Sequence, residues 1–214
     1  MKKIFLVFPV ILVFLTACTR TKSEFWPNGA IKSEITLKDN HYEGPAKFYY
    51  ETGQIQISCT YKNDKLHGQY LIFYPDGQRK EEQNFWNGVQ VGSNKVWDSQ
   101  GTLIKTANYS DGKLNGRFTE FWPNGSVMTE GEFRNGLYHG YWLYYDYSGS
   151  IAGYAKFHLG AGFQKAVYPD GSVRQITPFS NNLKDGEEQF YSPDGKIQKI
   201  NRYIKGQLFS NKTG

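Results

Sequence analysis

Histidines, cysteines and paired carboxylates are the residues through which this 214-residue chain could do chemistry. His67 and His139 each stand directly before a glycine but lie far apart in the sequence, so we expect no shared metal ion. The acidic pairs Glu81–Glu82 and Glu187–Glu188 occupy segments with strand character, where neighbouring side chains point to opposite faces. Neither pair can then form a general acid/base couple. The sequence also lacks a Cys-x-x-Cys motif, a phosphate-cradling glycine loop and a serine on a nucleophile elbow. We therefore expect no catalytic residues, no metal, no cofactor and no enzymatic activity.

Cys18 has a context that the other cysteine lacks. Lys2 and Lys3 precede an uncharged apolar run over residues 4–15, which is too short to span a bilayer and is typical of a secretory signal. The run ends in Leu15-Thr16-Ala17-Cys18, which resembles the bacterial lipoprotein processing box. That resemblance implies a signal peptide over residues 1–17, lipidation of Cys18 (a palmitate-type anchor) and a short tether over residues 18–24. It also implies a location in the bacterial cell envelope, on the outer membrane if the cell is Gram-negative.

Cys59 would be the one cysteine left for the folded part of the chain. The same position in other units of the repeat described below holds alanine or glycine, as at Ala107 and Gly131. We therefore expect Cys59 to be a small buried side chain with no disulfide partner.

The chain repeats itself with a period of 24 residues. The pentapeptide Phe-Trp-Pro-Asn-Gly occurs at residues 25–29 and again at 121–125, four periods later. Glycines mark the period at Gly29, Gly53, Gly77, Gly101, Gly125, Gly149, Gly171 and Gly195, and one step, the sixth, measures 22 residues. A second glycine lies nine residues before each of the later turn glycines: Gly44, Gly68, Gly92, Gly116, Gly140, Gly162 and Gly186. Such a register indicates a recurring structural unit.

Each unit has the pattern of a β-hairpin. Apolar residues recur eight positions after each turn glycine and, except at Arg79, two positions after it, as at Ile55 and Tyr61; these offsets share the parity of one strand face. Pro-Asn-Gly and Pro-Asp-Gly are reverse-turn sequences that tolerate positive φ. We place the second glycine in a loop between the two strands of the unit. The sequence therefore predicts an all-β, elongated, single-layer antiparallel meander of about eight hairpins, over residues 25–214. A parallel solenoid with one rung per period is the alternative fold.

The fifth unit reads Gly-Glu-Phe-Arg-Asn-Gly-Leu-Tyr-His-Gly over residues 131–140, and it is similar to the MORN repeat. Together with the Pro-Asx-Gly turns, it most resembles the bacterial MORN-variant repeats, including a group named antitoxin-like. The resemblance covers residues 25–209 and implies a hairpin ribbon used as a scaffold, for protein contact or, in some members, for lipid contact. His-Gly itself recurs only at His67 and His139.

Composition limits the partners. Apolar residues make up 39 % and aromatic residues 17 % of the chain, as suits a single layer whose aromatic side chains pack flat. The net charge of +5 is scattered and forms no long basic block, so we expect no nucleic-acid partner.

Aromatic side chains fall on columns of both parities, and those that cross-strand packing does not need are candidates for a partner surface. The sequence predicts that surface at Tyr70, Phe73, Phe118, Phe121, Trp142 and Tyr144. We expect a non-catalytic, membrane-anchored scaffold that binds a protein of unknown identity. The alternatives are a module that binds glycan, cell wall or a lipid surface through its aromatic faces, and an immunity-type protein that neutralises a toxin.

Overall fold

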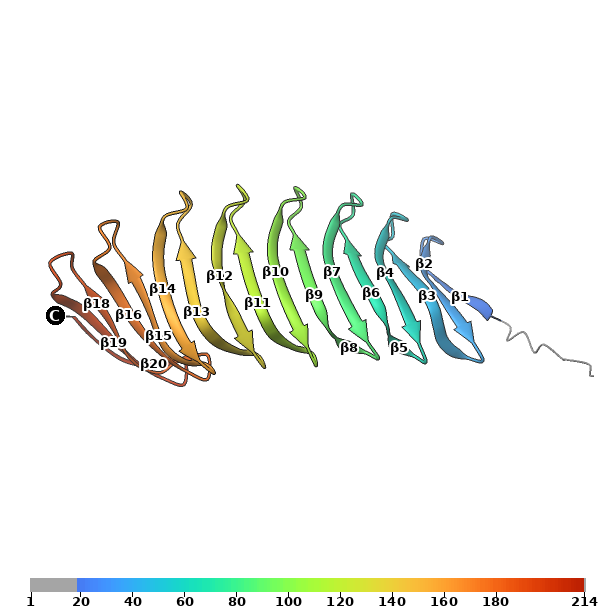
Figure 1. Ribbon diagram of the computed structural model, residues 1–214. Helices are drawn as coiled ribbons and strands as arrows, with labels where there is room; N and C mark the ends of the chain where they lie inside the picture. Colours follow the sequence, from blue (N-terminus) through green and yellow to red (C-terminus); the bar gives the residue numbers. More distant parts are fainter. Residues whose placement is uncertain (1–18, 214) are drawn as a thin grey trace, which may run out of the picture.

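The protein is a single open sheet one layer thick. The computed structural model describes residues 19–213, which form a 20-stranded sheet in which each strand pairs with antiparallel neighbours. Figure 1 shows the hairpins side by side from β1 to β20, with the strands bowed in the same direction. The all-β antiparallel meander is thus confirmed, and the parallel solenoid is excluded. No apolar helix of membrane-spanning length occurs within residues 19–213.

The strands follow the chain in order, and the short strands β5, β8 and β17 are continued by β6, β9 and β18 on the same partner. Their bounds are β1 (Thr19–Phe25), β2 (Ile31–Lys38), β3 (His41–Tyr49), β4 (Ile55–Lys62), β5 (Lys65–Leu66), β6 (Gly68–Phe73), β7 (Arg79–Trp86), β8 (Val89–Gln90), β9 (Gly92–Trp97), β10 (Leu103–Ser110), β11 (Lys113–Phe121), β12 (Val127–Arg134), β13 (Leu137–Tyr145), β14 (Ile151–His158), β15 (Ala161–Val167), β16 (Val173–Ser180), β17 (Leu183–Lys184), β18 (Gly186–Tyr191), β19 (Ile197–Ile204) and β20 (Gln207–Thr213).

The start of the chain differs in part from the prediction. Residues 19–24, expected in a tether, belong to β1, which pairs with β2 from Thr19↔Lys38 onward. The predicted signal peptide and the predicted lipidation site Cys18 lie outside the described residues.

The Pro-Asx-Gly turns are held by bonds within one hairpin and between hairpins. In the first copy, the amide of Gly29 donates to the carbonyl of Trp26 at 2.9 Å, and only the glycine has positive φ, at 85°. Asn28 does not adopt positive φ, contrary to the expectation for Asx residues here. Its Oδ1 accepts instead from the amide of Ala30 at 2.9 Å, and its Nδ2 donates to the carbonyl of Glu51 in the next turn, at 3.3 Å. This arrangement is a type I turn with a glycine bulge.

The tryptophan of the repeated pentapeptide also bonds to the next turn. Trp26 Nε1 donates to the carbonyl of Tyr49 at 3.2 Å, and Trp122 Nε1 donates to the carbonyl of Tyr145 at 3.3 Å. Tyrosine hydroxyls at the equivalent position make the same bond 23 residues ahead, from Tyr50, Tyr74 and Tyr168. Five turns therefore donate to the turn that follows them, and the pentapeptide supplies the donor at two of these five.

The opposite edge of the sheet is formed by two-residue turns at which both residues have positive φ. Asn63 and Asp64 form one of these, with φ of 48° and 63°. Two positive φ values define a type I′ turn, which matches the twist of the flanking strands. The amide of Asp64 also donates to the carbonyl of Tyr42 in the preceding hairpin, at 3.0 Å. Each two-residue turn from this one onward makes such a backbone bond to the hairpin before it, so the hairpins are joined along this whole side of the sheet.

In every unit but the sixth, the second glycine lies in a β-bulge and not in the connecting loop, so that prediction was wrong. Ile35 pairs with Ala46 and Leu37 pairs with Tyr42, which leaves three residues of β3 opposite one residue of β2. Gly44, with φ of 106°, is the middle residue of the three. A bulge of this kind lets extra residues leave the ladder without ending the strand pair.

The side chain opposite the bulge caps it. The Thr36 hydroxyl donates to the carbonyl of Pro45 at 2.8 Å. Asn84 and Asn108 make the equivalent bond to Ser93 and Arg117, each at 3.1 Å.

The sixth unit is two residues shorter because it has no bulge. β14 and β15 pair without any register shift, from Gly153↔Ala166 to His158↔Ala161. Its two-residue turn is bridged by Asn182 of the next hairpin. Asn182 Oδ1 accepts from the amide of Tyr138, and its Nδ2 donates to the carbonyl of Gly136, both at 2.8 Å. The deletion therefore replaces a local kink by a contact that spans three hairpins.

Candidate functional site

The sheet has a packed face and an open face. The packed face carries two clusters, one around Ile35, Ala46 and Cys59 and one around Trp142, Ala155 and Phe157. The open face carries the alternate residues of the same strands. The residues two positions after the turn glycine lie on the open face, because a bulge beside the turn shifts the register, as Ile31 and Ile151 show. The prediction that these residues share a face with those at offset eight was therefore wrong.

Trp142 is the centre of the second cluster. Its ring contacts Phe118, Phe133 and Tyr138 at centroid distances of 4.9–5.7 Å, and its side chain is 2 % exposed. The indole Nε1 lies 3.2 Å from the carbonyl oxygens of Glu132 and His139 and donates to both. Gly131 makes room for the ring, since a Cβ there would lie 2.2 Å from Trp142 Cδ2.

The predicted partner surface does not form one accessible patch. Trp142 is buried, so it cannot contact a partner, and we correct the prediction for this residue. Tyr70, Phe118 and Tyr144 are half-buried on the packed face, where they lie against the two clusters. Phe73 and Phe121 are half-buried and lie beside the turns. At both residues the register between the paired strands shifts by one residue.

Cys59 is buried at 4 % exposure, as predicted for a small core side chain. Burial raises the pKa of its thiol to about 11, so the nucleophilic thiolate is scarce at neutral pH.

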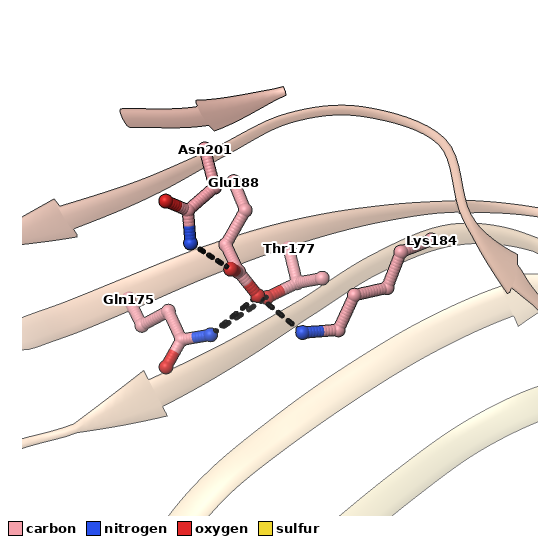
Figure 2. A network of polar contacts seen from close by, with 5 residues as sticks. All are labelled: Gln175, Thr177, Lys184, Glu188 and Asn201. Atoms are coloured by element: carbon pink, nitrogen blue, oxygen red, sulfur yellow. Dashed lines mark hydrogen bonds and ion pairs between the residues drawn. The ribbon is translucent and has the colours of Figure 1, made fainter. Parts of the chain in front are cut away.

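The packed face is interrupted by a polar cluster at its C-terminal end, shown in Figure 2. Glu188 on β18 is 1 % exposed. Its Oε1 accepts from Gln175 Nε2 at 2.8 Å, Thr177 Oγ1 at 3.0 Å and Lys184 Nζ at 2.6 Å. Its Oε2 accepts from Asn201 Nδ2 at 2.9 Å. Four side chains from β16, β17 and β19 thus converge on the carboxylate of Glu188.

The charge of Glu188 is held by its partners. Burial alone would raise the pKa of this carboxyl, but the hydrogen bonds from Lys184, Asn201 and Thr177 outweigh it and lower the pKa below its usual value. The carboxylate is therefore ionised and fully engaged, which suits a structural ion pair better than a proton donor.

The acidic pairs face opposite ways, as predicted. Glu187 is exposed while Glu188 is buried. Glu81 accepts from Asn94 Nδ2 at 2.8 Å on the packed face, whereas Glu82 pairs with Arg79 on the open face at 2.9 Å. Residues 19–213 contain no group of three or more His, Cys, Asp or Glu side chains that could hold a metal ion.

The open face presents, across β13, β14 and β15, aromatic and basic side chains that the sequence reasoning missed. Tyr141 is 70 % exposed, Phe163 is 59 % exposed and Tyr154 is 42 % exposed. Lys156 lies between Tyr141 and Phe163 in the register, and Lys165 lies beside Tyr154. We call these five residues the open-face patch. Its signal in the sequence was the occurrence of Tyr and Phe at offsets where most other units carry polar residues.

The comparisons bear on the repeats. A protein-family model described as MORN repeat variant matches residues 42–63, 66–87, 114–135 and 184–205. Each match runs from the first strand of a hairpin, through the turn with the period-marking glycine, to the two-residue turn after the second strand. These segments are MORN-variant repeats. The hairpins between the matched MORN-variant repeats have the same architecture, and β13 to β16 lie outside every match.

Among solved structures, the chain is similar to a porin-like protein from Bacteroides uniformis ATCC 8492. The two share 12 % identity over 91 % of this chain and 92 % of that chain, with a TM-score of 0.23. No curated protein matches the chain.

Proposed function

We propose that this protein is a non-catalytic scaffold that is tethered to a bacterial envelope membrane through Cys18 and holds another protein on its open face. The observation that carries the proposal is the difference in aromatic burial between the two faces of the sheet. On the packed face the aromatic side chains pack in the two clusters, whereas on the open face Tyr141, Tyr154 and Phe163 are exposed to solvent. Exposed aromatic side chains are enriched where proteins dock.

The contacts between hairpins support a rigid scaffold. Backbone bonds at the two-residue turns join successive hairpins, as at Asp64–Tyr42, and side-chain bonds at five of the opposite turns add to them, as at Trp26–Tyr49. A repeat array stitched in this way presents a long surface of fixed spacing, which is how solenoid proteins hold partners. The carboxylate that sequence and structure both single out, Glu188, is engaged by four donors and does not face a cleft.

The anchor is tested by replacing its nucleophile. Cys18→Ala should abolish incorporation of labelled palmitate and should leave an unprocessed precursor that migrates more slowly, because the thiol is the acceptor of the lipid. Cys59→Ala is the matched control and should label as the wild type does. Labelling of the Cys18→Ala chain would remove the tether from the proposal.

The scaffold itself is tested by cross-linking in intact cells, followed by solubilisation in detergent. The wild-type chain should recover one protein in a constant ratio, which an unrelated lipid-anchored protein from the same cells should not recover. Equal recovery by both baits would contradict a scaffold.

A further inference from the structure

The open-face patch is not required by the repeat. Tyr141 and Phe163 lie eight residues before their turn glycines, where other units have Pro45, Gln69, Ser93, Arg117 and Glu187. Tyr154 lies five residues after its turn glycine, where earlier units have Glu34, Ser58, Glu82, Thr106 and Glu130. Hairpins with polar residues at these positions fold in the same way, so the fold does not require aromatic side chains here.

The missing bulge explains why a lysine is free to stand at the centre of the patch. In three units with a bulge, the residue seven after the turn glycine caps a bulge carbonyl, as Thr36, Asn84 and Asn108 do. β14 and β15 pair without a bulge, so no such cap is needed opposite them. Lys156 occupies this position and places its Nζ 5.0 Å from the centroid of the Tyr141 ring.

The patch alternates aromatic and basic groups in two directions. Across the strands, the register runs Tyr141↔Lys156↔Phe163 in one row and Tyr154↔Lys165 in the next. Along the strands, Tyr154 and Lys156 on β14, like Phe163 and Lys165 on β15, are two residues and therefore about 6.8 Å apart. The same spacing separates side chains on one face of any extended peptide.

The charges of the patch are available to a partner. Among the described residues, neither Lys156 nor Lys165 has a carboxylate within ion-pairing distance. A surface groove of about 770 Å³ continues the patch past Tyr154 to Arg174. The two acidic groups in this groove are tied into turns, since Asp146 Oδ1 accepts from the amides of Ser148 and Ser150, and Asp170 Oδ1 accepts from the amide of Ser172.

We infer that the open-face patch is the docking site for an acidic protein segment, bound in an extended conformation with alternating carboxylate and apolar side chains on one face. Carboxylates would meet Lys156, Lys165 and Arg174, while apolar side chains would cover Phe163 and the two tyrosines. Charge complementarity of this kind fixes register and speeds encounter, and buried aromatic anchors supply most of the affinity. The inference rests on the proposed function and names the chemistry of its partner.

The test uses the full-length chain in detergent and a synthetic peptide that repeats Ser-Glu-Ser-Leu, so that glutamate and leucine alternate on one face. Fluorescence anisotropy should detect binding that weakens as salt rises, and the peptide with lysine in place of glutamate should bind at least about tenfold more weakly. The double variant Lys156→Glu/Lys165→Glu should lose at least about tenfold in affinity, about 1.4 kcal/mol or more.

The matched control is Lys47→Glu/Lys95→Glu. Both lysines are exposed, and each lies six residues before its turn glycine, as Lys165 does. Their substitution changes the net charge by the same amount as the patch variant does. This variant should bind the peptide within about twofold of the wild type. Equal loss in the two double variants, or equal binding of the two peptides, would overturn the inference.

Three other occupants would also overturn it. In the first two cases the wild type does not bind the peptide. If it binds phosphatidylglycerol vesicles and only the patch variant loses that binding, the patch is assigned to lipid. The same result with polygalacturonate assigns it to glycan. Self-association abolished by the patch variant would assign it to a second copy of the chain. A cross-linked partner that is still recovered with the patch variant would contradict this inference and leave the scaffold standing. Failure to recover any partner would contradict the scaffold, and with it the function on which this inference rests.

Discussion

Trp142→Ala is expected to lower the free energy of unfolding by about 3–5 kcal/mol, the range for removing a large aromatic side chain from a core. The indole packs against Phe118, Phe133 and Tyr138, and it bonds to two backbone carbonyls beside the bulge. In a single-layer sheet no second layer can close over the space it leaves. Urea denaturation followed by circular dichroism measures the change.

The neighbouring residue supplies the control for this loss. Tyr141→Ala removes an aromatic ring of similar size from the open face one residue away, and it should cost less than about 1 kcal/mol, the value of a cross-strand pair. Gly131→Ala should cost about 1–3 kcal/mol by overpacking, because its new Cβ would meet the indole ring. Equal losses for Trp142→Ala and Tyr141→Ala would contradict the assignment of the faces.

Glu188→Ala is expected to cost about 3–5 kcal/mol, because it leaves Lys184 facing a buried site without its counter-charge and leaves Gln175, Thr177 and Asn201 without an acceptor. Glu188→Gln keeps the shape and one acceptor oxygen, so it should cost less. The control is Glu187→Ala on the opposite face, which should change stability by no more than about 0.5 kcal/mol. The same urea titration at neutral pH compares the three variants.

The acid dependence of stability should reveal the same carboxylate. The folded state lowers the pKa of Glu188, so the unfolded chain binds the proton more readily. The stabilising contribution is therefore complete above the pKa of the unfolded chain and is lost as the pH falls through the lower pKa of the folded chain. Glu188→Gln should flatten this acid limb of the stability curve, whereas Glu187→Gln should not. An unchanged acid limb in Glu188→Gln would show that the network does not hold the charge.

The sequence was sufficient to predict the architecture, because the period and the turn residues act locally. A turn such as Pro27-Asn28-Gly29 closes one hairpin whatever surrounds it, so its recurrence predicted the meander correctly. The burial of Cys59 followed from the small residues at the same position of other units. The opposed directions of Glu187 and Glu188 followed from the alternation of side chains along one uninterrupted strand.

The errors arose where strands are interrupted. A bulge with one extra residue changes the count of residues between two positions without changing their types, so the parity of side chains across Ile55 could not be read from spacing. Gly44 looked like a loop residue because positive φ is common to turns and bulges. The two-residue deletion in the sixth unit was visible, but only the register of β14 and β15 shows that it removes a bulge.

The partner surface was misplaced for a related reason. Trp142 and Tyr141 are adjacent aromatic residues, and composition alone cannot say which of them is buried. The answer depends on Gly131, whose missing side chain admits the indole from the neighbouring strand. Pairing across strands, which sets this contact, is a non-local property.

The free energy of unfolding of the double variant Tyr141→Ser/Phe163→Ser tests most directly whether the open face is free of structural duty. If the packed face alone holds the sheet together, this variant should lose less than about 1 kcal/mol in urea denaturation. A loss that approaches the effect of Trp142→Ala, about 3 kcal/mol or more, would mean that these exposed rings stabilise the fold and are not reserved for a partner.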